Sequence, residues 1–475
     1  MTEKKHIHLI GICGTAMASL AGMLQQRGFR VTGSDAAAYP PMSDFLASLG
    51  IPLAQPFAAQ NLEPHPDMVV VGNAISRGNL ELEHVLDKRI PFCSMPQILH
   101  DEFLRGKEVL VVAGTHGKTT TTSMLSWIFD SAGLQPSFLI GGIAENFGSS
   151  FQLGSGKHFI LEGDEYDTAF FDKGPKFLHY FPDGVILTSV EFDHADIYKD
   201  LDAVETAFKR LVNLVPGRGR IIGFDQGDSI ERCLAKAFCS VERYGSSSKA
   251  TWQITNLKLQ PARTTWSVIH NGQPWADFEF ALGGEYNVCN ATAAAALAAG
   301  CGIPKEQIVA ALKSFKSVKR RLEVRAQVDG VTVIDDFAHH PTAIAGTLTA
   351  LRALYPGSRL WVILEPRSNT LRRNVFQNAL AESLALADEI VVANVFKSEA
   401  IPENERLDLP AVVKQVEKHG RRARILADAD AIVKSITPQM RSGDVVAILS
   451  NGGFGGIYEK LPAALRSLSA TEVRR

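Results

Sequence analysis

The sequence predicts an α/β protein of three domains, two of them Rossmann-like and a central one of the P-loop ATPase type. Its 475 residues suffice for about three domains of ordinary size. Short apolar runs alternate with helix-like stretches, and many of these runs end in polar or glycine-rich loops. Such alternation is typical of parallel sheets, in which ligands bind beyond the carboxyl ends of the strands. The predicted domains are residues 1–105, 106–320 and 321–475.

Composition indicates a globular protein with an ample core. Hydrophobic residues make up 45% of the chain, and the net charge of −2 gives no basic excess that would attract nucleic acid. No run reaches the roughly 18 apolar residues of a membrane span, and the first residues lack the apolar region of a signal peptide. The six cysteines form no CxxC pair, which is typical of reduced thiols. We therefore expect a cytoplasmic protein that binds neither nucleic acid nor a membrane, while its oligomeric state is not predicted.

The first domain opens like a Rossmann βαβ unit. A strand, a turn with Gly11 and Gly14, a helix and a second strand lead to Asp35. A dinucleotide fingerprint would need glycines where the chain has Cys13 and Ala16, so a nicotinamide-dependent dehydrogenase is disfavoured. A mononucleotide or a UDP-sugar fits the same turn and acidic residue. The alternative for Asp35 is a structural cap of the turn.

The central domain is predicted to begin with a shortened P-loop. An apolar run ends at Gly114, and Lys118 and Thr119 then open a helix-like stretch. The full pattern has one more glycine, at the position of Val112. A glycine-bearing turn at a helix N-terminus presents N–H groups to phosphate, the lysine adds charge, and the threonine hydroxyl can bind Mg²⁺. We therefore predict binding of a nucleoside triphosphate, the alternative being a plain strand–turn–helix connection.

Two further strands of the central domain end in acidic loops. Glu162 lies in the sequence EGDEYD, and His194 lies in EFDHAD after the next apolar run. Carboxylates gathered at a strand end are costly unless a cation neutralises them. Because both loops would lie beside the P-loop, we expect Glu162 and His194 to share Mg²⁺ with Thr119. Solvated acidic loops are the alternative.

Two later segments could also reach the nucleotide. Asn287 and Asn290 lie three positions apart, so they share one face of a predicted helix. Helix capping would also explain both asparagines. The basic run 319–321 lies at the junction with the third domain, where an arginine could reach the phosphates. A solvated charge run is the other interpretation of that segment.

The third domain is predicted from apolar runs that end in polar loops. These runs cover residues 331–334, 360–364 and 444–449. Each run is followed by a helix-like stretch, so a second doubly wound sheet is expected. Arg367 lies in the loop after the middle run, and its guanidinium could grip a carboxylate with two hydrogen bonds.

Six ordered motifs resemble those of the Mur ligases, the ATP-dependent amide-forming enzymes of peptidoglycan synthesis. The resemblance covers essentially the whole chain. The motifs are GTHGKTTTT at 114–122, EGDEYD at 162–167, EFDHADIY at 191–198, GEYNVCNATAA at 284–294, KRRLE at 319–323 and DDFAHHPT at 335–342. In addition, GICGTAM at 11–17 and TGSD at 32–35 resemble the branch of the family that binds UDP-N-acetylmuramate.

Three segments resemble a recycling branch rather than the L-alanine-adding branch. They are EYDTAFFDK at 165–173, EPRSNT at 365–370 and SNGGFGGI at 450–457. L-alanine-adding enzymes typically have ESDASF and a His-Arg-Tyr type segment at the first two places. The resemblance implies ligation of the tripeptide L-alanyl-γ-D-glutamyl-meso-diaminopimelate to UDP-N-acetylmuramate through an acyl phosphate. A UDP-N-acetylmuramate–L-alanine ligase and, more remotely, a non-catalytic UDP-sugar sensor are the alternatives.

The resemblance also implies roles for single residues. Lys118, Glu162 and His194 would act in catalysis, and Thr119, Glu162 and His194 would hold the metal. ATP would be bound by Gly114, Thr115, His116, Gly117, Lys118, Thr119, Thr120, Asn287, Asn290, Arg320 and Asp336. The UDP-sugar would be bound by Gly11, Cys13, Gly14, Asp35 and Asn146, and the peptide by Arg367, Ser368 and Asn369. Many Mur ligases carry a carbamylated lysine near the metal, and Lys209 lies at about the right place, although this branch often lacks that lysine.

Overall fold

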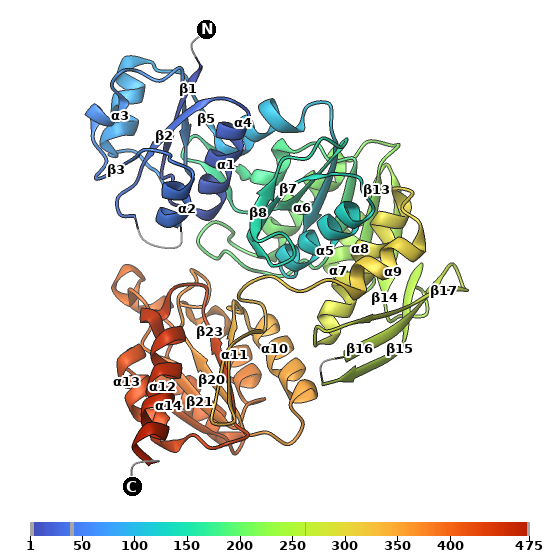
Figure 1. The fold of residues 1–475 in the computed structure, drawn as a ribbon, viewed down its shortest axis with the longest axis vertical. Coiled ribbons are helices and arrows are strands. Elements are labelled where there is room, and N and C mark those ends of the chain that lie inside the picture. The colour runs from blue at the N-terminus through green and yellow to red at the C-terminus, as the bar shows by residue number, and fades with distance from the viewer. Residues whose placement is uncertain (1–3, 39–41, 262, 473–475) are drawn as a thin grey trace.

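Each predicted domain contains one large sheet of its own. The computed structural model describes residues 4–38, 42–261 and 263–472. The strands of the three sheets lie within residues 6–94, 108–280 and 323–449. The N-terminal and C-terminal domains both lie against the central domain (Figure 1). The predicted class is confirmed, since the protein is α/β with three domains. The exact bounds 1–105, 106–320 and 321–475 stay a prediction.

The N-terminal domain is a Rossmann-like parallel sheet with the strand order β3-β2-β1-β4-β5. Its strands are β1 (His6–Ile10), β2 (Arg30–Ser34), β3 (Leu53–Ala54), β4 (Met68–Val71) and β5 (Phe92–Ser94). Its helices are α1 (Thr15–Gln26), α2 (Met42–Ser48), α3 (Leu80–Lys88) and α4 (Met95–Leu99). Every residue of β1 is buried, as expected for a parallel strand covered on both faces.

The central domain has ten strands in the order β17-β16-β15-β14-β13-β12-β6-β9-β7-β8. Its parallel core is β12 (Gly184–Leu187), β6 (Glu108–Ala113) and β9 (His158–Gly163). The other strands are β7 (Ser137–Ala144), β8 (Ser149–Gln152), β13 (Arg220–Phe224), β14 (Ser240–Gly245), β15 (Trp252–Gln260), β16 (Arg263–His270) and β17 (Gln273–Phe280), with a separate hairpin of β10 (Asp167–Ala169) and β11 (Asp172–Pro175). The helices are α5 (Lys118–Ser131), α6 (Leu201–Leu214), α7 (Asp228–Leu234), α8 (Glu285–Gly300) and α9 (Lys305–Lys313).

The C-terminal domain has six strands in the order β18-β19-β23-β20-β21-β22, all parallel except β18. They are β18 (Glu323–Val328), β19 (Val331–Asp336), β20 (Leu360–Leu364), β21 (Glu389–Ala393), β22 (Arg422–Leu426) and β23 (Val445–Leu449). The helices are α10 (Pro341–Leu354), α11 (Gln377–Leu384), α12 (Leu409–Lys418), α13 (Ala429–Ile436) and α14 (Ile457–Glu472). The three runs expected from the sequence are β19, β20 and β23, which lie side by side in this sheet.

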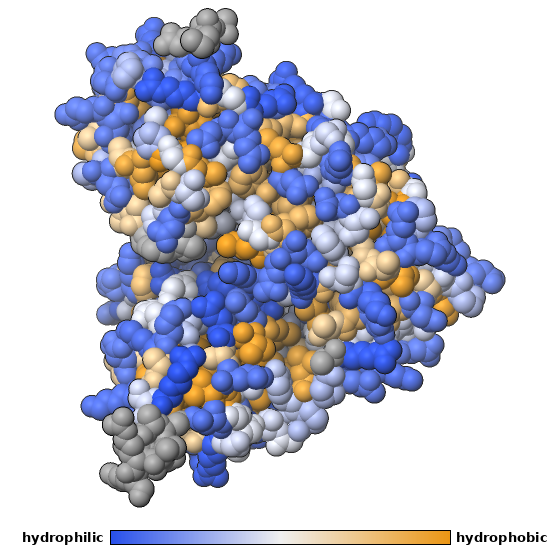
Figure 2. Space-filling view, viewed as in Figure 1, coloured by the Kyte–Doolittle hydropathy of each residue, from blue (hydrophilic) through white to orange (hydrophobic). Residues whose placement is uncertain are grey.

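Hydrophilic residues cover most of the face shown in Figure 2, with small apolar groups between them on all three domains. The described helices include none with the length and apolar character that crossing a bilayer requires.

The N-terminal domain packs on the central domain through a shared apolar core. One cluster of buried side chains runs without a break from β1 to α6. Phe151 of β8 packs edge-on against Phe45 with ring centroids 6.2 Å apart. It also lies so close to α1 that a Cβ on Gly22 would meet its ring at 2.8 Å. A hydrogen bond of 2.8 Å between the hydroxyls of Ser19 and Ser150 adds a polar contact at the same place.

Replacing Phe151 with alanine should weaken this junction. The ring is only 6% exposed, so its removal leaves a cavity and should lower the free energy of unfolding by about 3 kcal/mol. Urea-induced unfolding, followed by tryptophan fluorescence, would measure the loss. Phe181, which is 53% exposed, provides the control, because its replacement by alanine should change little. Equal losses for the two variants would contradict the packing described.

Candidate active site

The P-loop strand lies between the two strands that carry the acidic loops. β6 pairs in parallel with β9 on one side and with β12 on the other. Val112 is opposite Glu162, and Ala113 is opposite Leu187, so the three following loops begin at the same level of the sheet. Ligands of open α/β sheets bind at such an edge. The structure therefore brings the predicted P-loop and both acidic loops together.

The turn after β6 requires its two glycines. Gly114 has a φ of +134° and Gly117 a φ of +77°, values that side chains disfavour. A Cβ on Gly114 would lie 2.2 Å from Thr188 Oγ1, and a Cβ on Gly117 would lie 2.6 Å from Asn290 Oδ1. Since α5 begins at Lys118, its first N–H groups face the end of this turn. An anion bound there would lie at the positive end of the helix dipole.

Lys118 is held by an acid that the sequence analysis did not single out. Its Nζ donates to the Gly114 carbonyl at 2.7 Å and to Glu165 Oε2 at 2.9 Å. Burial alone would lower the pKa of Lys118, but the charge of Glu165 raises it above its ordinary value. Glu165 is 2% exposed and also lies 3.3 Å from His194 Nε2. The cluster of acids in EGDEYD was a signal for such a site, but nothing local distinguished Glu165 from its neighbours.

Thr119 and Glu162 are in contact, whereas His194 contacts Glu165. Thr119 Oγ1 donates to Glu162 Oε2 at 3.2 Å, and the Gly141 N–H donates to Glu162 Oε1 at 2.5 Å. Burial raises the pKa of Glu162. Burial alone would lower the pKa of His194, but its hydrogen bond to Glu165 raises it. Carboxylate and hydroxyl oxygens suit Mg²⁺, so these donor groups fit the predicted metal. Among the described residues, Glu162 and His194 do not belong to a cluster of three acidic, histidine or cysteine side chains whose ligand atoms already lie close together.

Most of the predicted ATP residues line one cavity of about 250 Å³. Its polar wall includes His116, Gly117, Thr120, Asn287, Asn290 and Asp336, and its apolar wall includes Phe224, Tyr244, Leu282 and Tyr286. Asn287 Nδ2 donates to the Gly283 carbonyl at 2.7 Å, which fixes the start of α8 beside the cavity. An apolar slot beside a helix N-terminus suits a purine whose phosphates extend toward the helix.

Arg321 faces this cavity and Arg320 does not. The Arg320 guanidinium is turned into the C-terminal domain, where it donates to the Ser450 carbonyl at 2.7 Å and to Asp335 at 3.2 Å. Arg321 lines the cavity and donates to Thr119 Oγ1 at 3.4 Å. Arg321 and not Arg320 lines the cavity here, and the role of Arg320 toward ATP stays a prediction. Arg320 has a left-handed φ of +63°, and its guanidinium and that of Arg321 contact different groups.

His340 packs against His116, a residue of the same cavity wall, with ring centroids 4.7 Å apart. The two histidines and Glu191 form a cluster whose possible ligand atoms all lie within 4.8 Å of one another. The Nδ1 of His340 accepts the Thr342 N–H at 3.3 Å, and its Nε2 lies 3.3 Å from the Phe192 carbonyl. A neutral ring that carries its proton on Nε2 satisfies both partners. Burial lowers the pKa of His340 to about 4.

In the N-terminal domain, Asp35 closes the turn after β1. It accepts the Cys13 N–H at 2.9 Å from the end of β2. Gly11 has a φ of +82°, and Gly14 lies just before α1. Burial raises the pKa of the Cys13 thiol to about 11, so the thiol stays neutral. The capping role of Asp35 is visible, while the roles of these residues toward a UDP-sugar stay predictions.

Two other residues of the sequence analysis are engaged elsewhere. The Asn146 side chain donates to the Ser314 carbonyl at 3.1 Å and accepts the Lys316 N–H at 2.8 Å. It therefore ties the turn between β7 and β8 to the segment that leads into the C-terminal domain, and its role toward the UDP-sugar stays a prediction. Lys209 pairs with Glu205 at 3.1 Å along α6. No contact in the described chain supports a metal-site role for Lys209.

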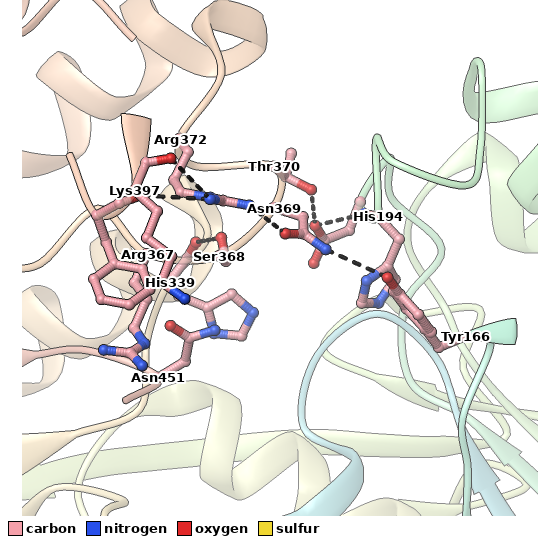
Figure 3. A pocket seen from close by; sticks show the side chains of 12 residues that line it. Tyr166, His194, His339, Arg367, Ser368, Asn369, Thr370, Arg372, Lys397 and Asn451 are labelled. Carbon is pink, nitrogen blue, oxygen red and sulfur yellow. Dashed lines mark hydrogen bonds between the residues drawn. The ribbon is translucent and has the colours of Figure 1, made fainter. Parts of the chain in front are cut away.

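A second cavity, of about 400 Å³, lies between the central and C-terminal domains (Figure 3). The three segments 165–173, 365–370 and 450–457 all contribute to its wall. The first contributes Tyr166, the second contributes Arg367, Ser368, Asn369 and Thr370, and the third contributes Asn451. The predicted peptide residues Arg367, Ser368 and Asn369 thus lie on one loop, which faces His194 across the domain boundary.

Three cationic side chains line this second cavity, and the sequence analysis predicted only Arg367. The Arg367 guanidinium lies 3.9 Å from the centre of the Phe396 ring. Gly452 is also so close that a Cβ there would lie 2.3 Å from Arg367 Nε. This packing holds the guanidinium in one orientation, ready for a planar anion. The other two cationic side chains are Arg372 and Lys397. The sequence analysis missed them because no local sequence pattern distinguishes them from ordinary surface cations.

The chain matches three family models along almost its whole length. Residues 6–105 match the Mur ligase family catalytic domain, residues 112–298 match the Mur ligase middle domain, and residues 320–452 match the Mur ligase glutamate ligase domain.

Two known proteins and one solved structure illustrate the similarity. The UDP-N-acetylmuramate–L-alanyl-γ-D-glutamyl-meso-2,6-diaminoheptandioate ligase of Escherichia coli (strain K12) is 44% identical over 457 residues, which are 96% of this chain and 97% of that one. The UDP-N-acetylmuramate–L-alanine ligase of Desulfitobacterium hafniense (strain Y51) is 31% identical over 455 residues, 96% of this chain and 98% of that one. A murein peptide ligase from Psychrobacter arcticus 273-4, whose crystal structure is known, is 38% identical in sequence. Its structure superposes with a TM-score of 0.75, and the match covers 97% of this chain and 99% of that one.

His340 should make stability depend on pH below neutrality. Its pKa is about 4 in the folded protein, against 6.5 ordinarily, so between these values the unfolded chain binds the proton more tightly. Stability is then highest above this window and falls as the pH drops through it. On going from about pH 7.5 to about pH 5 the wild type should lose about 2 kcal/mol more than the variant His340→Asn, in which asparagine still caps α10. Denaturant unfolding at both pH values measures this, and an equal loss in both proteins would contradict it.

Proposed function

The chain belongs to the Mur ligase family, and we propose that it joins L-alanyl-γ-D-glutamyl-meso-diaminopimelate to UDP-N-acetylmuramate in murein recycling. It is an ATP-dependent ligase that forms ADP. The relative named for these substrates is 44% identical over nearly the full length of both chains. The relative named for L-alanine shares 31%.

One observation carries the choice of peptide, namely that three segments far apart in the sequence meet in one cavity. They are the segments in which this chain differs from the L-alanine-adding branch. The tripeptide bears three free carboxylates and L-alanine bears one, and the cavity wall offers Arg367, Arg372 and Lys397. A volume of about 400 Å³ lies within the range of pockets that enclose ligands much larger than a single amino acid.

The first chemical step activates a carboxylate, which by itself is a poor electrophile. The lactyl carboxylate of N-acetylmuramate attacks the γ-phosphate of ATP, ADP leaves, and an acyl phosphate forms. Lys118 stands at the start of α5, where its Nζ can exchange Glu165 for the phosphates. Arg321 reaches Thr119 at the same place and adds a second positive charge.

The second step forms the amide bond. The alanyl amine, after losing a proton, attacks the acyl carbonyl, and phosphate leaves. His194 lines the peptide cavity and contacts Glu165. Glu165 in turn accepts a hydrogen bond from Lys118. This short series of contacts places the bound peptide next to the phosphate site. The contribution of the protein is therefore mainly to hold the reactants in place.

We assign Mg²⁺ to Thr119, Glu162 and His194, where it would neutralise phosphate charge. The hydroxyl of Thr119 already contacts the Glu162 carboxylate at 3.2 Å. For the UDP part of the substrate we retain Gly11, Cys13, Gly14, Asp35 and Asn146. All six cysteines of the chain are unpaired, and we retain a cytoplasmic location as part of the proposal.

The reaction is tested by phosphate release from ATP with Mg²⁺ and UDP-N-acetylmuramate. The acceptors to compare are the tripeptide and L-alanine. Release that depends on the tripeptide, together with a product of the matching mass, is the expected result. Release with L-alanine alone would assign the chain to the biosynthetic branch instead. Absence of release with either acceptor would favour a non-catalytic UDP-sugar sensor.

Replacing Arg367 with alanine should weaken peptide binding selectively. Loss of one charge-assisted contact to a carboxylate should raise the KM for the tripeptide about 10- to 100-fold and leave the KM for ATP unchanged. Initial rates at varied tripeptide and varied ATP give both constants. The matched control is Arg441→Ala, because Arg441 is exposed and precedes β23, at the sheet edge opposite the cavity. An unchanged tripeptide KM in the Arg367 variant would contradict the assignment.

A further inference from the structure

His194 has a backbone conformation that its neighbours must enforce. Its φ is +56°, in the left-handed region that residues other than glycine rarely adopt. It lies after β12 in the segment 193–198, which we call the His194 turn, and its carbonyl accepts the N–H groups of Ile197 and Tyr198 at 2.9 and 3.0 Å. A strained residue of this kind persists only where surrounding contacts determine its conformation.

Thr370 of the C-terminal domain supplies such contacts on both sides of His194. Its hydroxyl donates to Asp193 Oδ1 at 2.6 Å and accepts the Ala195 N–H at 3.2 Å. The same Asp193 oxygen accepts the His194 N–H at 2.7 Å. Both side chains are buried, with Thr370 3% and Asp193 6% exposed, so water does not compete freely for these bonds. Figure 3 shows Thr370 reaching this turn from the opposite domain.

The neighbouring Asn369 holds the far end of the same turn. Its Nδ2 donates to Asp196 Oδ2 at 2.7 Å and to the Tyr166 hydroxyl at 3.3 Å. The Tyr166 ring in turn packs edge-on against the His194 ring, with centroids 5.1 Å apart. Asn369 and Thr370 therefore both form hydrogen bonds to the His194 turn. Arg367, on the same loop, lines the peptide cavity.

We propose that Thr370 is a positioning residue that sets His194 for a divalent cation from across the domain boundary. The inference rests on the proposed function, in which His194 is a metal ligand. Thr370 does not itself ligate the ion. Its hydroxyl fixes the two peptide units that flank His194 and so directs the imidazole, as the outer partners of metal ligands do in other proteins. The loop that receives the peptide thereby also completes the metal site.

Two simpler roles for Thr370 make different predictions. Thr370 lines the peptide cavity, so a residue that only contacts peptide would change the tripeptide KM and nothing else. A residue that only stabilises the fold would change the melting temperature and would not affect a metal bound without peptide. A positioning residue instead changes metal affinity when peptide is absent.

The test measures Mn²⁺ binding by electron paramagnetic resonance on the full-length protein, with a non-hydrolysable ATP analogue and no peptide. Thr370→Val removes the hydroxyl and keeps the side-chain shape, whereas Thr370→Ser keeps the hydroxyl. We expect the Kd for Mn²⁺ to rise about tenfold in Thr370→Val and to stay close to the wild-type value in Thr370→Ser. His194→Ala provides the reference for loss of the ligand itself.

An equal Mn²⁺ Kd in the wild type and Thr370→Val would overturn the proposal, and so would a change confined to the tripeptide KM. If His194→Ala binds Mn²⁺ as tightly as the wild type, the metal role assigned under the proposed function fails, and the inference fails with it. If Thr370→Val melts below the assay temperature, Asn369→Ala gives the second test. Asn369 is only half-buried, so its loss should loosen the turn without unfolding the domain and should raise the Kd in the same direction. An unchanged Kd there would overturn the proposal.

Discussion

Buried charge at the ends of β6, β9 and β12 is the constraint on which the rest of the site depends. A buried carboxylate is costly without a cation, and Glu165 has Lys118 and His194 as partners. If Lys118 binds the phosphates as we propose, a bound nucleotide would leave Glu165 short of positive charge. In the proposed function, a divalent cation that enters with the nucleotide would restore the balance. Nucleotide and metal binding would then depend on each other.

The two flanking domains are attached to the central domain by different physical means. An apolar core continues into the N-terminal domain, where Phe151 packs beneath α1. The C-terminal domain instead meets the acidic loops through hydrogen bonds, such as Thr342 to Glu191 at 2.7 Å and Asn369 to Asp196 at 2.7 Å. Where such contacts reach solvent they can be exchanged with water at little net cost, whereas opening an apolar junction exposes its surface to water. This difference suits a C-terminal domain that opens for a peptide and closes over the activated carboxylate.

The local parts of the fold and the site could be predicted from the sequence. The P-loop was predicted from Gly117, Lys118 and Thr119, because a glycine turn between an apolar run and a helix leaves few other interpretations. Neighbouring parallel strands bring their carboxyl ends together, so Glu162 was expected beside Thr119, and the two are in contact. The three α/β domains were predicted in the same way, from apolar runs that each end in a polar loop. Hydrophobic periodicity and turn chemistry act over a few residues. The sequence by itself therefore determines structural features that extend over a few residues, such as a strand, a turn or the start of a helix.

Only the tertiary structure decided which side chains face the ligands. Arg320 and Leu322 both have a positive φ, so side chains around the domain junction do not alternate, and Arg321 rather than Arg320 reaches the phosphate site. Glu165 became a partner of Lys118 because β9 lies next to β6, and Thr370 reached His194 because two domains dock. A side chain's direction and its partners from distant segments depend on backbone angles and packing that no short stretch of sequence specifies.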